Sequence, residues 1–246
     1  MKKLLIIICF LLIPSLSWAW HSAVMGAGVV AAAPSYQTPA WVKDATMYSG
    51  GLANDVSLAN VTSGNFLIMA VTGSSSMAIT GVNTSTSNTS AWTSAGGVED
   101  VTNQTEIQIY WACATESGTV SAKPAGTNSD CGYTMTEYSG VACTTPQVGT
   151  IQNDIASGAE TGFTTGTITA AQTHNLLFGV WASEEADQTI TWGSGWSMLE
   201  NITSHIHKTA EKVITDGSGN YTLSGTFNET SNKWISAFVM FKAASN

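Results

Sequence analysis

The sequence predicts an all-β protein: a two-layer antiparallel β-sandwich, jelly-roll-like, built from two weakly similar halves. Three observations lead to this prediction. Short segments of strand character alternate with clusters of Gly, Ser, Thr and Asn about every ten residues, which is the spacing typical of sandwiches and barrels. Helical periodicity is nearly absent. The order of features in the first half also returns in the second half.

The chain opens with the features of a secretory signal peptide. Two lysines precede an apolar run from Leu4 to Ile13, and Ser17 and Ala19 place small residues three and one positions before a cut. The apolar run is too short to span a bilayer, which takes about 20 residues. We expect residues 1–19 to be removed and the product to be secreted, extracellular or periplasmic.

Composition argues against a nucleic-acid partner. Arginine is absent, and removal of the first 19 residues would leave six lysines against 17 acidic residues, a net charge of about −11. Binding to phosphates requires a basic face, which this chain lacks. No later segment is long and apolar enough for a membrane helix, so no transmembrane segment is expected.

Residues 20–40 are small and apolar, with two prolines, and we interpret them as a leader strand or a tether. The remainder, 41–246, is expected to form a single β-sandwich domain with pseudo-repeat halves of about 41–145 and 146–246. No Pro-rich or charged linker separates these halves, so two independent domains are the less favoured alternative.

The repeat is visible in two pairs of strand segments. One pair consists of Gly64-Asn65-Phe66-Leu67-Ile68 and the similar segment His174-Asn175-Leu176-Leu177-Phe178, 110 residues later. The other pair consists of Tyr133–Ser139 and Ile235–Phe241, at a spacing of 102. Several of these segments are apolar on both faces. We expect them to be central strands covered on both sides, or strands whose outer face meets another element.

Several of these segments also resemble those of a loosely defined group of exported bacterial and phage-appendage β-sandwich modules. The similar segments include Glu106–Ala112, Glu137–Val141, Gly193–Trp196 and Trp234–Lys242, and the resemblance covers about Trp41 to Lys242. It implies the sandwich fold. Modules of that group are generally of unassigned function and occur in surface or virion proteins.

Three cysteines follow the predicted cleavage site, which permits one disulfide and leaves one thiol. Cys131 and Cys143 bracket one extended strand of about eight residues, roughly 26 Å long, so they cannot pair. If the strands before and after them run up, down and up, Cys113 lies near Cys143. We therefore prefer Cys113–Cys143 and keep Cys113–Cys131 as the alternative, in both cases as a structural bond.

No motif predicts catalysis or a cofactor. His205, His207 and Glu211 would share one face of a strand, as metal ligands could, but the same run would equally form a solvated edge strand. The acidic pairs at 99–100 and 184–187 lie in or beside turns, where neighbouring carboxylates point apart, unlike those of a glycosidase. Nucleophile elbows, phosphate loops and zinc-protease helices are missing. We therefore expect no metal and lean away from an enzyme.

Aromatic residues are the remaining candidates for a ligand site, because sugar rings stack on exposed Trp and Tyr faces. Trp92 lies in a polar loop, Trp192 and Trp196 flank Gly193-Ser194-Gly195, and Tyr110 shares a strand face with polar neighbours. These four are the predicted ligand-binding residues. The alternative for each tryptophan is that it folds back and caps the sandwich.

These observations favour an exported, non-catalytic surface, appendage or matrix binding module with a glycan or another cell-surface polymer as partner. A secreted polysaccharide-active enzyme and a structural subunit of an extracellular or virion assembly are the alternatives. In the last of these the chain would associate with itself, with residues 20–40 pairing with a neighbour.

Overall fold

The computed structural model describes residues 34–49, 54–73, 79–126, 131–184, 188–202 and 207–246. These residues form antiparallel sheets packed on one another and contain no helix, so the prediction of an all-β sandwich is confirmed. The predicted signal peptide, 1–19, and most of the predicted leader lie outside the described residues.

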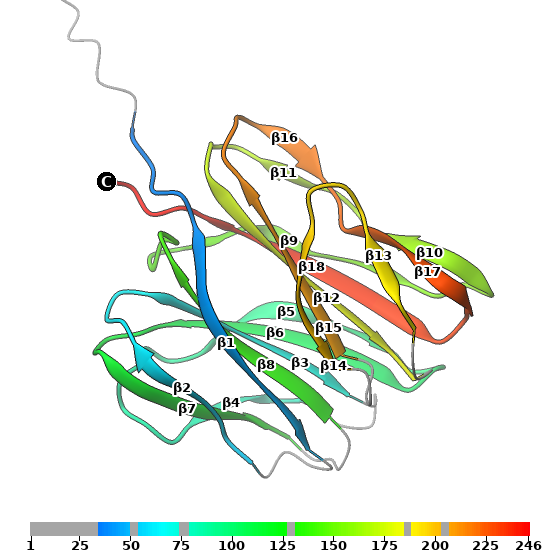
Figure 1. The fold of residues 1–246 in the computed structure, drawn as a ribbon, viewed down its shortest axis with the longest axis horizontal. Coiled ribbons are helices and arrows are strands. Elements are labelled where there is room, and N and C mark those ends of the chain that lie inside the picture. Colours follow the sequence, from blue (N-terminus) through cyan, green and yellow to red (C-terminus); the bar gives the residue numbers. More distant parts are fainter. Residues whose placement is uncertain (1–33, 50–53, 74–78, 127–130, 185–187, 203–206) are drawn as a thin grey trace, which may run out of the picture. The chain divides into compact units, whose positions relative to one another are not determined.

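The first half folds as a sandwich of its own. A five-stranded sheet in the order β1-β8-β3-β6-β5 packs on a three-stranded sheet in the order β2-β7-β4, and the chain passes back and forth between them as in a jelly roll. Figure 1 shows these strands in blue to green. The strands are β1 (Ala40–Ser49), β2 (Val56–Val61), β3 (Phe66–Gly73), β4 (Gly81–Thr84), β5 (Thr93–Asp100), β6 (Thr105–Cys113), β7 (Gly118–Ala125) and β8 (Cys131–Ser139).

The second half repeats this plan. Its five-stranded sheet has the order β14-β15-β12-β18-β9, and its outer layer consists of the sheet β10-β17-β13 and the strand pair β11-β16. The strands are β9 (Gln147–Ile155), β10 (Glu160–Thr164), β11 (Ile168–Ala170), β12 (Asn175–Ser183), β13 (Ile190–Trp192), β14 (Ser197–Ile202), β15 (His207–Ile214), β16 (Gly219–Tyr221), β17 (Ser224–Ser231) and β18 (Trp234–Lys242).

The strand order makes the internal repeat explicit, because β1-β8-β3-β6-β5 corresponds to β9-β18-β12-β15-β14. Phe66 pairs with Tyr138, and Leu176, 110 residues after Phe66, pairs with Phe241. The closing strands are therefore related by 103 residues rather than the expected 102. The difference matters because a slip of one residue exchanges the two faces of a strand.

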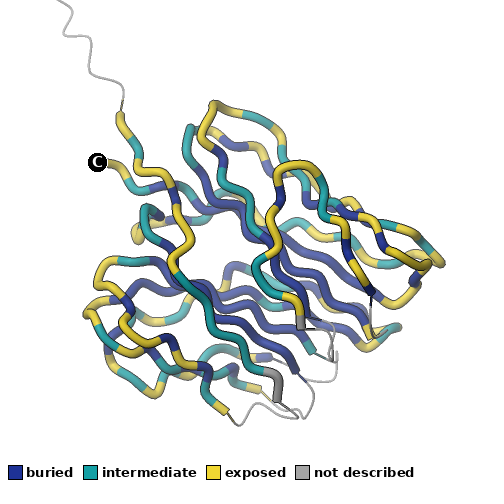
Figure 2. Tube along the Cα trace, viewed as in Figure 1, coloured by how far each residue is buried: buried dark blue, intermediate teal, exposed yellow. Residues whose placement is uncertain are grey.

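The two five-stranded sheets pack face to face, and their contact explains the segments that are apolar on both sides. One face of β3, β12 and β18 lies in the core of its own half, and the other lies in the layer between the halves. Figure 2 shows these central strands as continuous buried traces. The core between the halves includes the side chains of Phe66, Ile68, Ile107, Ile109, Leu176, Phe178, Ile235, Val239 and Phe241.

Candidate functional site

Two of the predicted ligand-binding tryptophans belong to the core of the second half. Trp196 is only 8% exposed, donates a hydrogen bond from Nε1 to the Thr222 carbonyl oxygen at 3.1 Å and meets Phe238 edge to face. Trp192 is half-buried and lies perpendicular to Phe163, with ring centroids 5.9 Å apart. Both rings cap the sandwich, and only Trp192 keeps an appreciable part of its surface open.

The other two predicted residues lie in the first half. Trp92 is half-buried against the core and donates a hydrogen bond from Nε1 to Thr84 Oγ1 at 2.9 Å. The expectation that Tyr110 is an exposed aromatic is wrong, because the sheet β2-β7-β4 covers its face of β6 and leaves Tyr110 5% exposed. Burial, and then the charge of Glu106, raise the pKa of Tyr110. The four predicted residues are therefore divided between the halves.

The disulfide joins Cys113 and Cys143, the pairing that the strand directions favour. β6 and β8 both pair antiparallel with β3, so they run parallel to each other and end on the same side of the sheet. The bond thereby attaches the end of β6 to the segment that connects the two halves. Cys131 remains unbonded to another cysteine and is buried.

His207 is a buried core residue rather than an exposed metal ligand. β15 is an inner strand between β14 and β12, not a solvated edge, and His207 is fully buried between the halves. Its Nδ1 lies 3.0 Å from Thr72 Oγ1 and its Nε2 lies 2.8 Å from Thr134 Oγ1, so both ring nitrogens are occupied. His205 lies outside the described residues.

The first of the two acidic pairs, at 99–100, lies beside a turn, as expected. Asp100 accepts hydrogen bonds from the backbone amides of Thr102 and Asn103, which closes the loop after β5. Residues 185–187 lie outside the described part. Among the residues that are described, no three His, Cys, Asp or Glu side chains come together as metal ligands.

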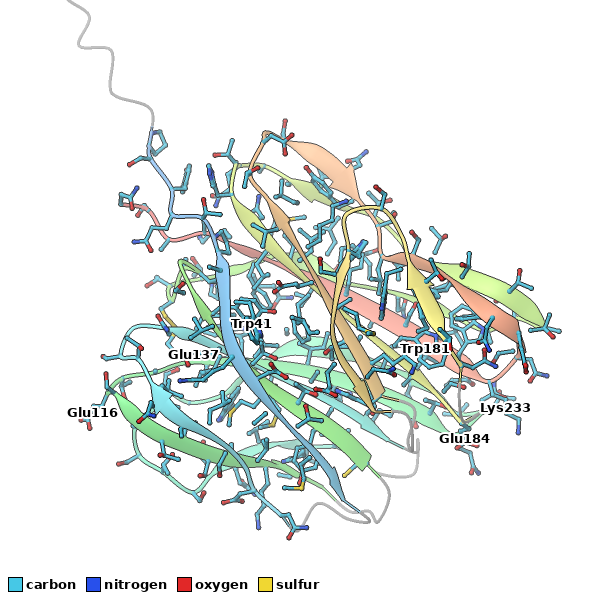
Figure 3. All side chains as sticks on the ribbon, in the orientation of Figure 1. Trp41, Glu116, Glu137, Trp181, Glu184 and Lys233 are labelled. Carbon is cyan, nitrogen blue, oxygen red and sulfur yellow. A yellow bond between two sulfur atoms is a disulfide. The ribbon has the colours of Figure 1, made fainter. Side chains whose placement is uncertain are left out.

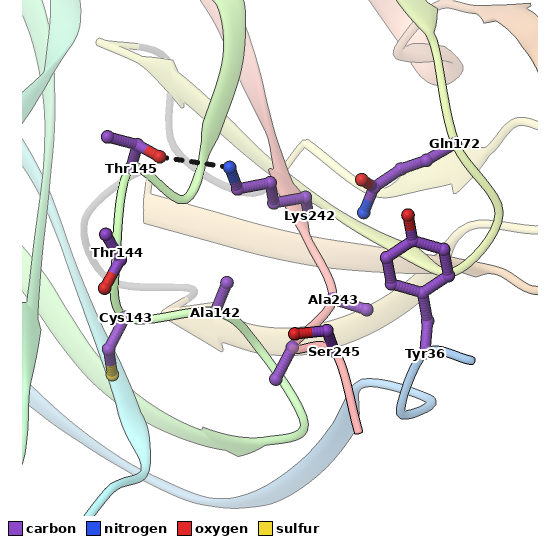
Figure 4. A pocket seen from close by; sticks show the side chains of 10 residues that line it. Tyr36, Ala142, Cys143, Thr144, Thr145, Gln172, Lys242, Ala243 and Ser245 are labelled. Carbon is purple, nitrogen blue, oxygen red and sulfur yellow. Dashed lines mark hydrogen bonds between the residues drawn. The ribbon is translucent and has the colours of Figure 1, made fainter. Parts of the chain in front are cut away.

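A polar pocket, which the sequence did not predict, lies where the segment connecting the halves passes the end of β18. It is open, encloses about 540 Å³ and is lined by Tyr36, Ala142, Cys143, Thr144, Thr145, Gln172, Lys242, Ala243, Ala244 and Ser245. Figure 4 shows Tyr36 and Gln172 on one side, the two threonines on the other and Lys242 between them. None of these ten residues is acidic.

The side chains of this pocket offer both donors and acceptors. Lys242 Nζ donates a hydrogen bond to Thr145 Oγ1 at 3.0 Å, and the ring of Tyr36 forms part of the wall. Gln172 Nε2 is buried and has no hydrogen-bond partner among the described residues. A buried amide without a partner is costly, so a polar ligand or an ordered water that accepts its hydrogen bond would stabilise it.

Sequence reasoning missed this pocket because its residues come from four distant segments. Two isolated antiparallel β-bridges, Tyr36 with Ser245 and Val141 with Ala243, bring the two ends of the fold to the connecting segment. Only Tyr36 carried a local signal, as an isolated aromatic residue in the predicted leader. Trp41 was named only as the start of the predicted domain, and its exposed ring was not among the predicted ligand-binding residues.

The chain matches no protein-family model, no curated protein and no solved structure in the comparisons. The described residues contain no helix that is long and apolar enough to cross a membrane.

Proposed function

We propose that this chain is an exported, non-catalytic binding module of a surface, appendage or matrix, and that the polar pocket binds a glycan. The observation that carries the proposal is the pocket itself, where the ring of Tyr36, the unpartnered amide of Gln172 and several hydroxyl groups line one cavity. Aromatic rings contact the apolar faces of sugars, while amides and hydroxyls bind their hydroxyl groups.

Two features support export. The first 19 residues have the composition of a signal peptide, and a disulfide joins Cys113 to Cys143. Disulfides persist in oxidising compartments, such as the periplasm and the extracellular medium. Mass spectrometry of the protein from the medium or periplasm would test this part, since we expect Trp20 as the first residue.

Binding is favoured over hydrolysis because the pocket contains no carboxylate. Glycoside hydrolysis uses a pair of Asp or Glu side chains on either side of the scissile bond. All ten residues that line the pocket are neutral except Lys242. A polysaccharide-active enzyme would need its carboxylates elsewhere on the chain.

A structural subunit is the second candidate, and one observation favours it. β1 is an edge strand of its sheet and carries two exposed apolar residues, Trp41 and Val42. Exposed edges pair readily with strands of other chains. Light scattering of the mature protein, with and without residues 20–33, tests this candidate, and an unchanged monomer mass in both would remove it.

The glycan proposal is tested with a glycan array on the mature protein. We expect Tyr36→Ala and Gln172→Ala to abolish the signal on the glycans that bind, whereas Trp92→Phe, Trp192→Phe and Trp196→Phe retain it. Loss of binding in the tryptophan variants alone would move the site to those residues. The absence of binding to every glycan would refute the proposal.

A further inference from the structure

The two halves meet along two edges that the internal repeat relates to each other, and the edges differ in chemistry. At the first edge, β5 packs on β9: Gln147 Nε2 donates to the Ala95 carbonyl oxygen at 2.9 Å. A Cβ atom on Gly96 would lie only 2.8 Å from Ile151 Cγ2. This edge is closed by close packing of an apolar side chain on backbone.

At the second edge, where β1 lies near β14, carboxyl groups take the place of that packing. In the internal repeat, Glu200 is the counterpart of Gly96. Gly96 pairs with Ile109, and Glu200 pairs with Thr209, which follows Ile109 by 100 residues. The Glu200 side chain contacts that of Asp44 on β1 through a shared hydrogen bond. Glu211 on β15 faces Tyr138 on β8. Asp44, Glu200 and Glu211 are called the acidic seam below.

The carboxyl groups of the acidic seam are partly desolvated. Desolvation, and then the charge of Glu200, raise the pKa of Asp44, and desolvation raises the pKa of Glu211. Two lysines are sequence neighbours of the seam. Lys43 Nζ, beside Asp44, lies 3.0 Å from Glu137 Oε2, and Lys212 Nζ, beside Glu211, donates a hydrogen bond to the Ser194 carbonyl oxygen at 3.0 Å. Figure 3 labels Glu137 and Trp41 beside β1.

Two buried hydroxyl groups behind the acidic seam also lack partners. Thr136 and Thr209 are 0% exposed, and their side-chain oxygens have no hydrogen bond within the described residues. Thr136 pairs with Asp44 and Thr209 pairs with Glu200. The Tyr138 hydroxyl forms a side-chain hydrogen bond with Glu211, and desolvation, followed by the charge of Glu211, raises the pKa of Tyr138. Buried polar groups are nearly always hydrogen-bonded, so an ordered water or a bound ligand beside the two threonine oxygens would satisfy them.

An aromatic ring lies at the rim of the acidic seam. Trp41 pairs with Tyr138, is 47% exposed and forms a side-chain hydrogen bond with Asp44. An indole that donates its N–H to a carboxylate keeps its face free, and the face of an indole attracts cations.

We propose that the acidic seam is a binding site for an alkylammonium group, carried by an amino sugar or a polyamine. Such a group has a positive charge and three N–H donors and no acceptor. It matches carboxylates and hydroxyl oxygens that lack donors, beside an aromatic face. The net charge of −9 attracts cationic ligands to the chain in general, so the seam supplies the local selectivity. The seam shares no residue with the polar pocket, and the proposal does not depend on glycan binding there.

Titration calorimetry of the mature protein at neutral pH tests the proposal, with glucosamine and spermidine as probes and N-acetylglucosamine as the neutral analogue. In a Tyr36→Ala background, which removes glycan binding at the polar pocket, we expect saturable binding of at least one amine and none of the neutral analogue. Preference for glucosamine or for spermidine distinguishes the two sources of the amine. Asp44→Asn and Glu200→Gln keep the shape of the side chains and should each weaken binding about tenfold or more.

Glu116→Gln is the matched control, because Glu116 is exposed in the turn after β6 and should leave binding unchanged. Thermal melts of each variant verify folding, and Trp41→Phe provides a further readout that does not change charge. No saturable binding of either amine up to about 50 mM would overturn the proposal, and water alone would then fill the seam. Equal binding of N-acetylglucosamine in the Tyr36→Ala background, or equal weakening by Glu116→Gln, would also overturn it.

Discussion

Acidification should destabilise this protein through one buried imidazole, His207. The side chain is fully buried between the two halves, and both ring nitrogens lie within 3.0 Å of threonine hydroxyls. Desolvation, and then the charge of Lys208, lower the pKa of His207 from 6.5 to about 3. The ring is therefore neutral in the folded protein and protonates readily only after unfolding.

The sign and the size of the effect follow from this difference in pKa. Below pH 6.5 the unfolded chain binds a proton that the folded chain does not, so the free energy of unfolding falls by about 1.4 kcal/mol per pH unit. The stability that neutral His207 contributes is fully present above pH 6.5 and is lost as the pH falls toward 3. The loss is about 2 kcal/mol at pH 5 and about 5 kcal/mol in total.

Urea unfolding between pH 7.5 and 4, with the wild type and His207→Gln, measures this contribution. Glutamine does not titrate, so the difference in unfolding free energy between the two proteins should shrink by about 3 kcal/mol from pH 7.5 to 4. Carboxyls with a raised pKa, such as Asp44, Asp154 and Glu211, act in the opposite direction and cancel in this difference. A difference that does not change with pH, or an imidazole NMR titration of His207 near pH 6.5, would refute the reasoning.

Three further predictions concern how the halves are held together. Cys113→Ser removes a crosslink between residues 30 positions apart and should lower the unfolding free energy by about 3 to 4 kcal/mol in urea; a loss below about 1 kcal/mol would contradict it. Gly96→Ala should lower it by about 1 to 3 kcal/mol because φ is +126° and Ile151 blocks the new Cβ, whereas Gly158→Ala, in open space, should change little; equal effects would disprove the close packing. The first half expressed alone should dimerise or aggregate, because it exposes the apolar face of its five-stranded sheet; a stable monomer by light scattering would show that the halves fold independently.

Much of the fold was predictable because strand periodicity is a local property. Clean alternation identified half-covered strands, and the run from Phe66 to Val71, apolar on both faces, already indicated a strand with two covered faces. What periodicity does not say is which element covers the second face. In this protein it is the matching sheet of the other half, and each half is a sandwich in itself.

The candidate sites were less predictable, because they join residues that are distant along the chain. Tryptophans near glycine turns resemble exposed platforms in the sequence, yet the outer sheets bury the ring of Trp196 and cover Tyr110. The pocket residues Tyr36 and Gln172 have no sequence pattern in common. Asp44 and Glu200 also have no sequence pattern in common, and their side chains meet only because the two large sheets face each other.

The sequence by itself determined the β class and the twofold internal repeat and favoured Cys113–Cys143 over Cys113–Cys131, because each depends on residue order along one or a few neighbouring strands; the structure decided the pairing. Only the tertiary structure decided which faces are covered, that His207 is buried, and that one edge between the halves is packed while the other is acidic. The physical reason is that burial and charge pairing depend on contacts between sheets. A shift of one residue in strand register, or the presence of a facing sheet, changes these contacts without changing the local sequence pattern.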